Sequence, residues 1–87
     1  MQNVECRSDD TKLHDNLENA AECATHCRAQ AGCIFFAFGL AGGPREGQCY
    51  WEKTSAASCP EGFITVDKNH LYEMLTGKTI RLVITRR

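Results

Sequence analysis

The chain has 87 residues, which is the size of one small domain, and six of these residues are cysteines. All 11 acidic residues lie within residues 1–77, together with six of the ten basic residues, whereas residues 78–87 carry four basic residues and no acidic one. The main part of the chain is therefore acidic, which argues against a nucleic-acid binder, and the chain contains no apolar run of the roughly 20 residues that a membrane span requires.

The clearest predicted element is a helix over residues 20–31, which follows a plausible short strand at residues 3–6. Asn19 is suited to the N-cap position, and Glu22 can complete a capping box by bonding back to the N-cap backbone. The segment is rich in alanine, which favours a helix, and Gly32 can adopt the left-handed conformation that ends one. Its cysteines and alanines form a stripe of small residues, which suits close packing against a sheet.

Strands are predicted in most of the rest of the chain, because its apolar runs are short and rich in aromatic and β-branched residues. They cover residues 33–38, 48–53, 63–66 and 70–75. The segments 39–47 and 54–62 are rich in glycine and other turn-forming residues, and they are predicted loops. We therefore expect an α+β domain over residues 1–77 with one helix and four or five antiparallel strands. A basic tail, residues 78–87, follows it as an extra edge strand or an inter-domain linker.

The spacing of the cysteines restricts how they can pair. Cys23 and Cys27 lie one helical turn apart with nearly parallel side chains, so a bond between them would strain the geometry of a disulfide. Cys33 follows the end of the helix and is close enough to fold back onto Cys27, although six cysteines allow fifteen pairings in all. Paired cysteines imply an oxidising compartment, so we expect this sequence, which starts with polar residues, to be the mature fragment of a secreted or extracellular protein.

A lone early cysteine, C-x3-C on the helix, C-x5-C across its end, an aromatic run, a glycine-rich loop and the strand CYWE together resemble a PAN/apple module. The resemblance covers residues 3–75 and implies one helix cradled by a curved antiparallel sheet. It also implies three disulfides: Cys6–Cys59, Cys23–Cys49 and Cys27–Cys33. The short body and the CYWE strand are most similar to the apple modules of apicomplexan microneme adhesins, which implies secretion from micronemes.

Two other roles for the cysteines have less support from their spacing. A zinc site built on the helical cysteines would need a second matching pair, but Cys49 and Cys59 lie ten residues apart. A thiol nucleophile would need a base within reach, but His26 and Cys27 are neighbours on a helix and point about 100° apart. A small zinc- or thiol-dependent cytosolic protein is therefore an alternative from another functional class.

Sites for other ions or for nucleotides also have little support. Asp9 and Asp10 offer two carboxylates to calcium, but the sequence shows no further oxygen ligands beside them. The loop 39–47 lacks the glycine spacing of phosphate-binding loops. We expect no catalytic residue, no metal and no cofactor.

The residues expected to contact a ligand lie in the glycine-rich loop and in the strands. Tyr50 and Trp51 are consecutive strand residues and point to opposite faces, so the one that faces outward can stack on a sugar ring or anchor a protein partner. The candidate contacts are Tyr50, Trp51, Arg45 and Tyr72.

The resemblance implies a non-enzymatic, extracellular adhesion and recognition module that binds protein or carbohydrate ligands. We expect one of several tandem copies in a secreted adhesin that serves host-cell attachment or the assembly of adhesin complexes, with a host-cell receptor or another adhesin as partner. An alternative within the same class is the partner-docking apple module of a secreted protease zymogen. In either case, disulfides would hold the helix on the sheet while loops present a preordered contact surface.

Overall fold

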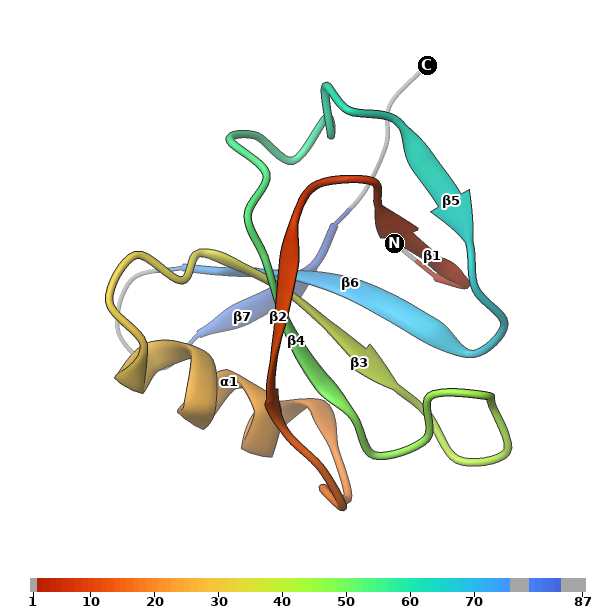
Figure 1. The fold of residues 1–87 in the computed structure, drawn as a ribbon. Helices are drawn as coiled ribbons and strands as arrows, with labels where there is room; N and C mark the ends of the chain where they lie inside the picture. The colour runs from red at the N-terminus through yellow and green to blue at the C-terminus, as the bar shows by residue number, and fades with distance from the viewer. Residues whose placement is uncertain (1, 76–78, 84–87) are drawn as a thin grey trace.

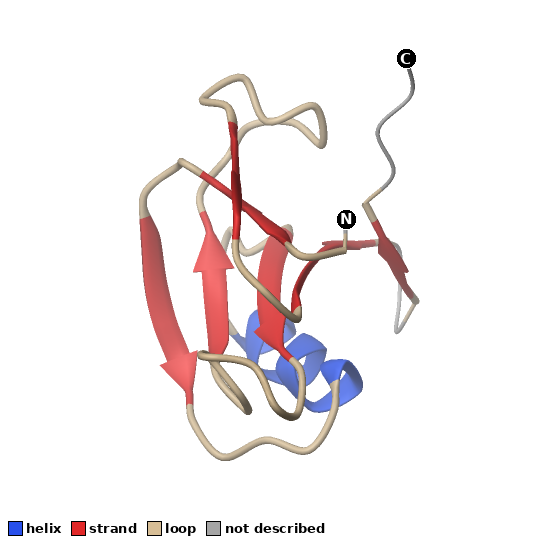
Figure 2. Ribbon diagram, turned by 90° about the vertical axis from the view of Figure 1, so that its right-hand side faces the viewer, coloured by secondary structure: helices blue, strands red, loops and turns tan. Residues whose placement is uncertain are grey.

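The computed structural model describes residues 2–75 and 79–83. A helix lies against one face of a five-stranded antiparallel sheet, and a two-stranded sheet lies toward the other face (Figure 1). In chain order the elements are β1 (Val4–Cys6), β2 (Asp10–His14), α1 (Ala20–Ala29), β3 (Phe35–Gly39), β4 (Cys49–Glu52), β5 (Phe63–Thr65), β6 (Asn69–Met74) and β7 (Ile80–Leu82). Figure 2 shows α1 and the strands from the side. The predicted α+β fold is confirmed.

The five-stranded sheet has the order β2-β4-β3-β6-β7, so β3 lies at its centre. Every residue of β3 is buried, which explains its continuous apolar sequence, because a strand covered on both faces has no polar side. Phe36 and Phe38 pack with the cysteines of the helix. Phe35 points the other way and packs with Leu71 and Val83 in a second, smaller core.

Two features of the sheets were not predicted. Strand β2, with the sequence DTKLH, pairs with β4 and forms one edge of the large sheet. Strands β1 and β5 lie in predicted strand segments, but they pair with each other in a sheet of their own. Because β2 is mostly polar and exposed, its sequence shows no apolar alternation that would predict a strand. Its pairing with β4 keeps it in the strand conformation.

Helix α1 ends two residues before its predicted end. The Asn19 side chain accepts a hydrogen bond from the backbone N–H of Glu22 at 3.0 Å, as expected of an N-cap. The Glu22 carboxylate accepts a hydrogen bond from the backbone N–H of Glu18 at 2.6 Å and not from that of Asn19, so the reciprocal bond of the capping box is shifted by one residue. The helix ends because Gln30 has an extended backbone with φ of −94° and ψ of 117°.

Three disulfides connect these elements, and they are the same pairs that the PAN/apple resemblance implies. Cys23–Cys49 joins α1 to β4. Cys27–Cys33 joins the end of α1 to the segment before β3, and Cys6–Cys59 joins β1 to the loop before β5. All six sulfur atoms are in these bonds. No thiol therefore remains for the zinc or nucleophile alternatives, both of which need free thiolates.

Part of the predicted basic tail lies within the described residues. Strand β7 pairs antiparallel with β6 at the second edge of the large sheet. Val83, which follows β7, is 2% exposed and belongs to the smaller core. Residues 78 and 84–87 of the tail lie outside the described residues, and the boundary between a domain over 1–77 and a tail over 78–87 stays a prediction.

Candidate recognition site

The four predicted contact residues lie on two opposite faces of the five-stranded sheet. Strand β4 alternates, so Trp51 points toward the helix and Tyr50 points to the other face. Tyr72 of β6 shares the helix face, because Trp51 and Tyr72 are both registered with Phe36 of the central strand. Arg45, in the loop between β3 and β4, lies beside Tyr50. The structure thus brings two candidates together and places the other two on the opposite face.

Arg45 and Tyr50 form a cation–π pair, with Cζ of the arginine 5.0 Å from the centroid of the tyrosine ring. Nη1 of Arg45 also lies 3.0 Å from Oε2 of Glu5 in β1. The Tyr50 hydroxyl donates a hydrogen bond to Oε1 of Gln48 at 2.9 Å. These contacts hold both side chains in one orientation, while 34% of the Arg45 side chain remains exposed. A planar cation and a partly exposed aromatic ring therefore lie side by side at the surface.

The loop that carries Arg45 is closed by backbone hydrogen bonds to the end of β3, and Figure 1 shows it as a compact projection beyond β3 and β4. The N–H of Gly39 donates to the carbonyl of Gln48 at 3.2 Å, and the N–H of Gly47 donates to the carbonyl of Gly39 at 2.9 Å. Within the loop, the N–H of Gln48 donates to the carbonyl of Arg45 at 3.0 Å. The position of Arg45 is therefore set by the backbone of the loop.

Replacing Gly39 by alanine is expected to displace this loop and to lower the free energy of unfolding by more than about 2 kcal/mol. A Cβ atom at Gly39 would lie 1.8 Å from the carbonyl oxygen and 2.4 Å from the carbonyl carbon of Arg45. Both are backbone atoms, which cannot rotate away as a side chain can. Thermal unfolding of the variant measures the effect.

A matched glycine controls for the change of residue type. Gly32 has φ of 82°, which disfavours alanine, but a Cβ there would meet no atom closer than 3.8 Å. Gly32→Ala should therefore cost only about 1 kcal/mol. If Gly39→Ala destabilises the domain no more than Gly32→Ala does, the loop is not packed against β3 as described.

Trp51 and Tyr72 lie at the half-buried margin of the main core. The Tyr72 ring stacks on Phe36 with centroids 5.2 Å apart, and burial raises the pKa of the Tyr72 hydroxyl above its usual value. The Trp51 ring packs against the same core, with Nζ of Lys53 4.7 Å from its centroid. Both residues contribute to packing on the helix face, and a contact of either with a ligand stays a prediction.

A cluster of buried polar side chains adjoins the Arg45–Tyr50 pair, and it was not predicted. Glu5, Glu52 and Asn69 are 3%, 1% and 0% exposed. Nδ2 of Asn69 donates to Oε2 of Glu5 at 3.0 Å, and the Ser8 hydroxyl donates to Oε2 of Glu52 at 3.1 Å. Burial, together with the nearby charges of Glu5 and Asp10, raises the pKa of Glu52 to about 8. Oε1 of Glu52 and Oδ1 of Asn69 are buried without a hydrogen-bond partner.

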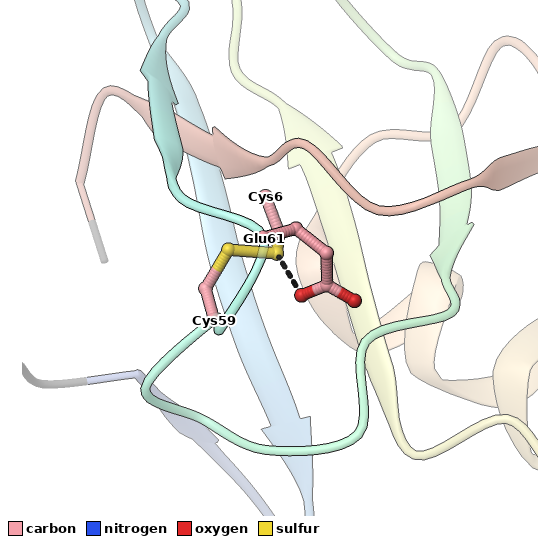
Figure 3. A group of neighbouring side chains, drawn as sticks. All are labelled: Cys6, Cys59 and Glu61. Atoms are coloured by element: carbon pink, nitrogen blue, oxygen red, sulfur yellow. Dashed lines mark hydrogen bonds between the residues drawn. A yellow bond between two sulfur atoms is a disulfide. The ribbon is translucent and has the colours of Figure 1, made fainter.

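The outer disulfide, Cys6–Cys59, lies next to another acidic side chain. Figure 3 shows the Glu61 carboxylate beside the two sulfur atoms, with its Oε1 3.4 Å from Sγ of Cys6. The Thr54 hydroxyl donates a hydrogen bond to the same oxygen at 2.8 Å. The disulfide holds the loop between β4 and β5 against β1, and the hydrogen bond between Thr54 and Glu61 joins two parts of that loop.

The histidines take part in contacts between elements. The ring of His26 in α1 stacks on the ring of His14 in β2, with centroids 4.3 Å apart. Nδ1 of His70 accepts a hydrogen bond from the backbone N–H of Asn3 at 3.3 Å. Because the cysteine beside His26 is in a disulfide, the histidine has no thiol to activate.

Comparison with known families assigns this fold, because the PAN domain model matches residues 1–75. The chain belongs to the PAN domain family. No curated protein and no solved structure matches it significantly. PAN domains are extracellular, non-catalytic modules that bind proteins or carbohydrates.

The structure of this PAN domain agrees with that general role. Three disulfides in a domain of this size are typical of secreted and extracellular proteins. Within the described residues, no helix has both the length and the apolar character needed to cross a membrane. The face opposite α1 carries the Arg45–Tyr50 pair on a sheet and a loop that are fixed by hydrogen bonds.

Proposed function

We propose that this PAN domain is a recognition module of a secreted adhesin and that its ligand contacts the Arg45–Tyr50 pair and the loop between β3 and β4. The observation that carries this proposal is the fixed geometry of the pair, which Glu5 and Gln48 hold from either side. A ligand that binds such a preordered surface does not have to order it, so little conformational entropy is lost on binding.

The chemistry of the pair suits the two ligand classes of the family. A sugar ring can stack on the Tyr50 ring while its hydroxyls accept hydrogen bonds from the Arg45 guanidinium. A carboxylate of a protein partner can instead pair with the guanidinium in two parallel hydrogen bonds. Arginine and tyrosine are also among the residues that contribute most to protein interfaces.

The cellular role is proposed from the sequence. The short body and the CYWE strand resemble those of the apple modules of apicomplexan microneme adhesins. This similarity supports a role in host-cell attachment or in the assembly of adhesin complexes, with a host-cell receptor or another adhesin as the partner. As one of several tandem copies, each module could bind weakly while the whole adhesin binds tightly.

Tyr50→Ala is expected to weaken ligand binding at least tenfold, because it removes the aromatic surface and the support of Arg45. The neighbouring residue on the opposite face provides the control, and Trp51→Phe should change the affinity less than about twofold. A glycan array measures carbohydrate binding. Binding to the surface of cultured animal cells, before and after enzymatic removal of surface glycans, measures binding to protein receptors.

A loss of binding is informative only if the variant is folded, so the thermal unfolding midpoint of each variant is also measured. A folded Tyr50→Ala protein that binds as well as the wild type would contradict the proposed surface. Equal losses for the folded Tyr50→Ala and Trp51→Phe proteins would also contradict it, because the two residues lie on different faces.

A further inference from the structure

Three carboxylates from three different strands come together in the buried polar cluster. Asp10 of β2 lies opposite Glu52 of β4 in the strand register, and Glu5 reaches them from β1 in the other sheet. One oxygen from each of the three lies within 4.8 Å of the other two. The sequence shows only the pair Asp9–Asp10 as a weak calcium candidate, and the fold supplies Asp10 with the two partners that this pair lacks.

The separation of the oxygens allows a calcium ion to bind between them. Three oxygens that lie within 4.8 Å of one another share a point no more than about 2.8 Å from each of them, and calcium binds oxygen at about 2.3–2.6 Å. Shifts of a few tenths of an ångström would therefore complete the contacts. Magnesium demands a strict octahedron at about 2.0–2.1 Å and gives up its water ligands reluctantly, so we expect it to bind this site less well.

A second observation comes from the hydrogen bonds of Glu52. This side chain is 1% exposed, and its Oε2 accepts a hydrogen bond from the Ser8 hydroxyl. Its Oε1 is buried and has no hydrogen-bond partner. A buried carboxylate oxygen without a partner is costly, and native folds pair nearly all such atoms with a protein group, an ordered water or an ion. A cation bound between the three carboxylates would provide the missing partner.

The charges of the cluster also favour a divalent cation. The Arg45 guanidinium lies 3.0 Å from Glu5 and can offset one of the three negative charges. With Glu52 and Asp10 both ionised, as they would be around a bound cation, two negative charges then remain to balance it. Asp10 is exposed, so water can reach this side of the cluster and fill the remaining positions of a calcium ion, which binds six to eight oxygens.

We propose that Glu5, Asp10 and Glu52 bind one calcium ion between β1, β2 and β4. The ion would join the two-stranded sheet to the five-stranded sheet beside the Arg45–Tyr50 pair. It would therefore stabilise the fold whichever ligand the module recognises.

The test is thermal unfolding of the oxidised chain in 10 mM calcium chloride, in 10 mM magnesium chloride and in chelator. Extracellular calcium sites bind with Kd of about 10⁻⁴–10⁻³ M, so 10 mM calcium is at least about ten times Kd. At ten times Kd the unfolding midpoint should rise by about 6–11 °C, and magnesium should have a much smaller effect. Isothermal titration with calcium should give one ion per chain.

The calcium response of single variants shows which residues bind the ion. Glu52→Gln keeps the shape of the side chain but removes its charge, and it should abolish the response to calcium. Asp9→Asn removes the same charge from an exposed neighbour that is not in the three-oxygen group, and it should keep the response within about 1 °C. If Glu52→Gln does not fold, Asp10→Asn replaces an exposed side chain and should abolish the response in the same way.

Two results would overturn the proposal. One is the absence of any rise in the midpoint with calcium beyond that with magnesium. Another is an undiminished calcium response in folded Glu52→Gln, which would place the bound ion elsewhere.

Discussion

Replacing Cys6 and Cys59 together by alanine is expected to lower the free energy of unfolding by about 4 kcal/mol. This disulfide spans 53 positions of the sequence, whereas Cys27–Cys33 spans 6. In the chain-entropy model a longer closed loop restricts the unfolded chain more, and the short loop contributes only about 2.4 kcal/mol. A loss of about 4 kcal/mol is a large part of the stability of a small domain, so the variant should be partly unfolded at body temperature.

Urea unfolding without reductant, followed by the fluorescence of Trp51, measures this loss. The double variant Cys27→Ala, Cys33→Ala is the matched control, because it also removes one disulfide and two sulfur atoms. The two variants should differ by nearly 2 kcal/mol in the free energy of unfolding. Equal losses, or a larger loss for the short loop, would show that local packing and not chain entropy sets the contribution of each disulfide.

Replacing Glu52 by glutamine is expected to stabilise the domain in calcium-free buffer, increasingly so as the pH rises toward 8. The pKa of Glu52 is raised from its ordinary value of 4.5 to about 8, so the folded state binds this proton more tightly than the unfolded state does. That stabilisation is fully present below about pH 4.5 and is lost as the pH rises through about 8. Glutamine cannot ionise, so the variant should gain about 2–4 kcal/mol on the wild type between pH 5 and 8.

Urea unfolding of both proteins at pH 5, 6.5 and 8, with chelator present, measures this difference. Glu18→Gln, which makes the same substitution at an exposed position, is the control for the change of residue type. A difference between Glu52→Gln and the wild type that does not change with pH would contradict a raised pKa. So would a variant that becomes less stable than the wild type as the pH rises.

The elements that carry local signals were predictable from the sequence. Helix α1 has an N-cap at Asn19 and a run of alanine, and β3 has an apolar run that only a strand buried on both faces would need. Strand β2 has neither signal, because four of its five side chains are polar and solvent-exposed. Its structure comes from pairing with β4, whose partner residues lie about 35 to 42 positions away in the sequence.

In the candidate site, too, only the features that depend on adjacent residues were predictable. Strand alternation predicted that Tyr50 and Trp51 point to opposite faces, because side-chain direction depends only on adjacent residues. The same alternation places Glu52 on the Tyr50 face, and this charged residue at the end of a short aromatic strand was a sign of a buried acid. Its neighbours Glu5 and Asp10 lie more than 40 positions away, however, and only the tertiary fold brings them together.

The Cys23–Cys49 disulfide has a consequence for how the sheet matures during oxidative folding. Cys49 is the first residue of β4 and is registered with Phe38 of β3. A slip of β4 by one residue would invert its side chains and turn this sulfur away from α1. Chains with β4 out of register would then keep free thiols, which oxidoreductases in the secretory pathway can exchange. Chains with β4 in the correct register form the Cys23–Cys49 disulfide. The Cys23–Cys49 disulfide thus favours chains in which β4 has the correct register with β3.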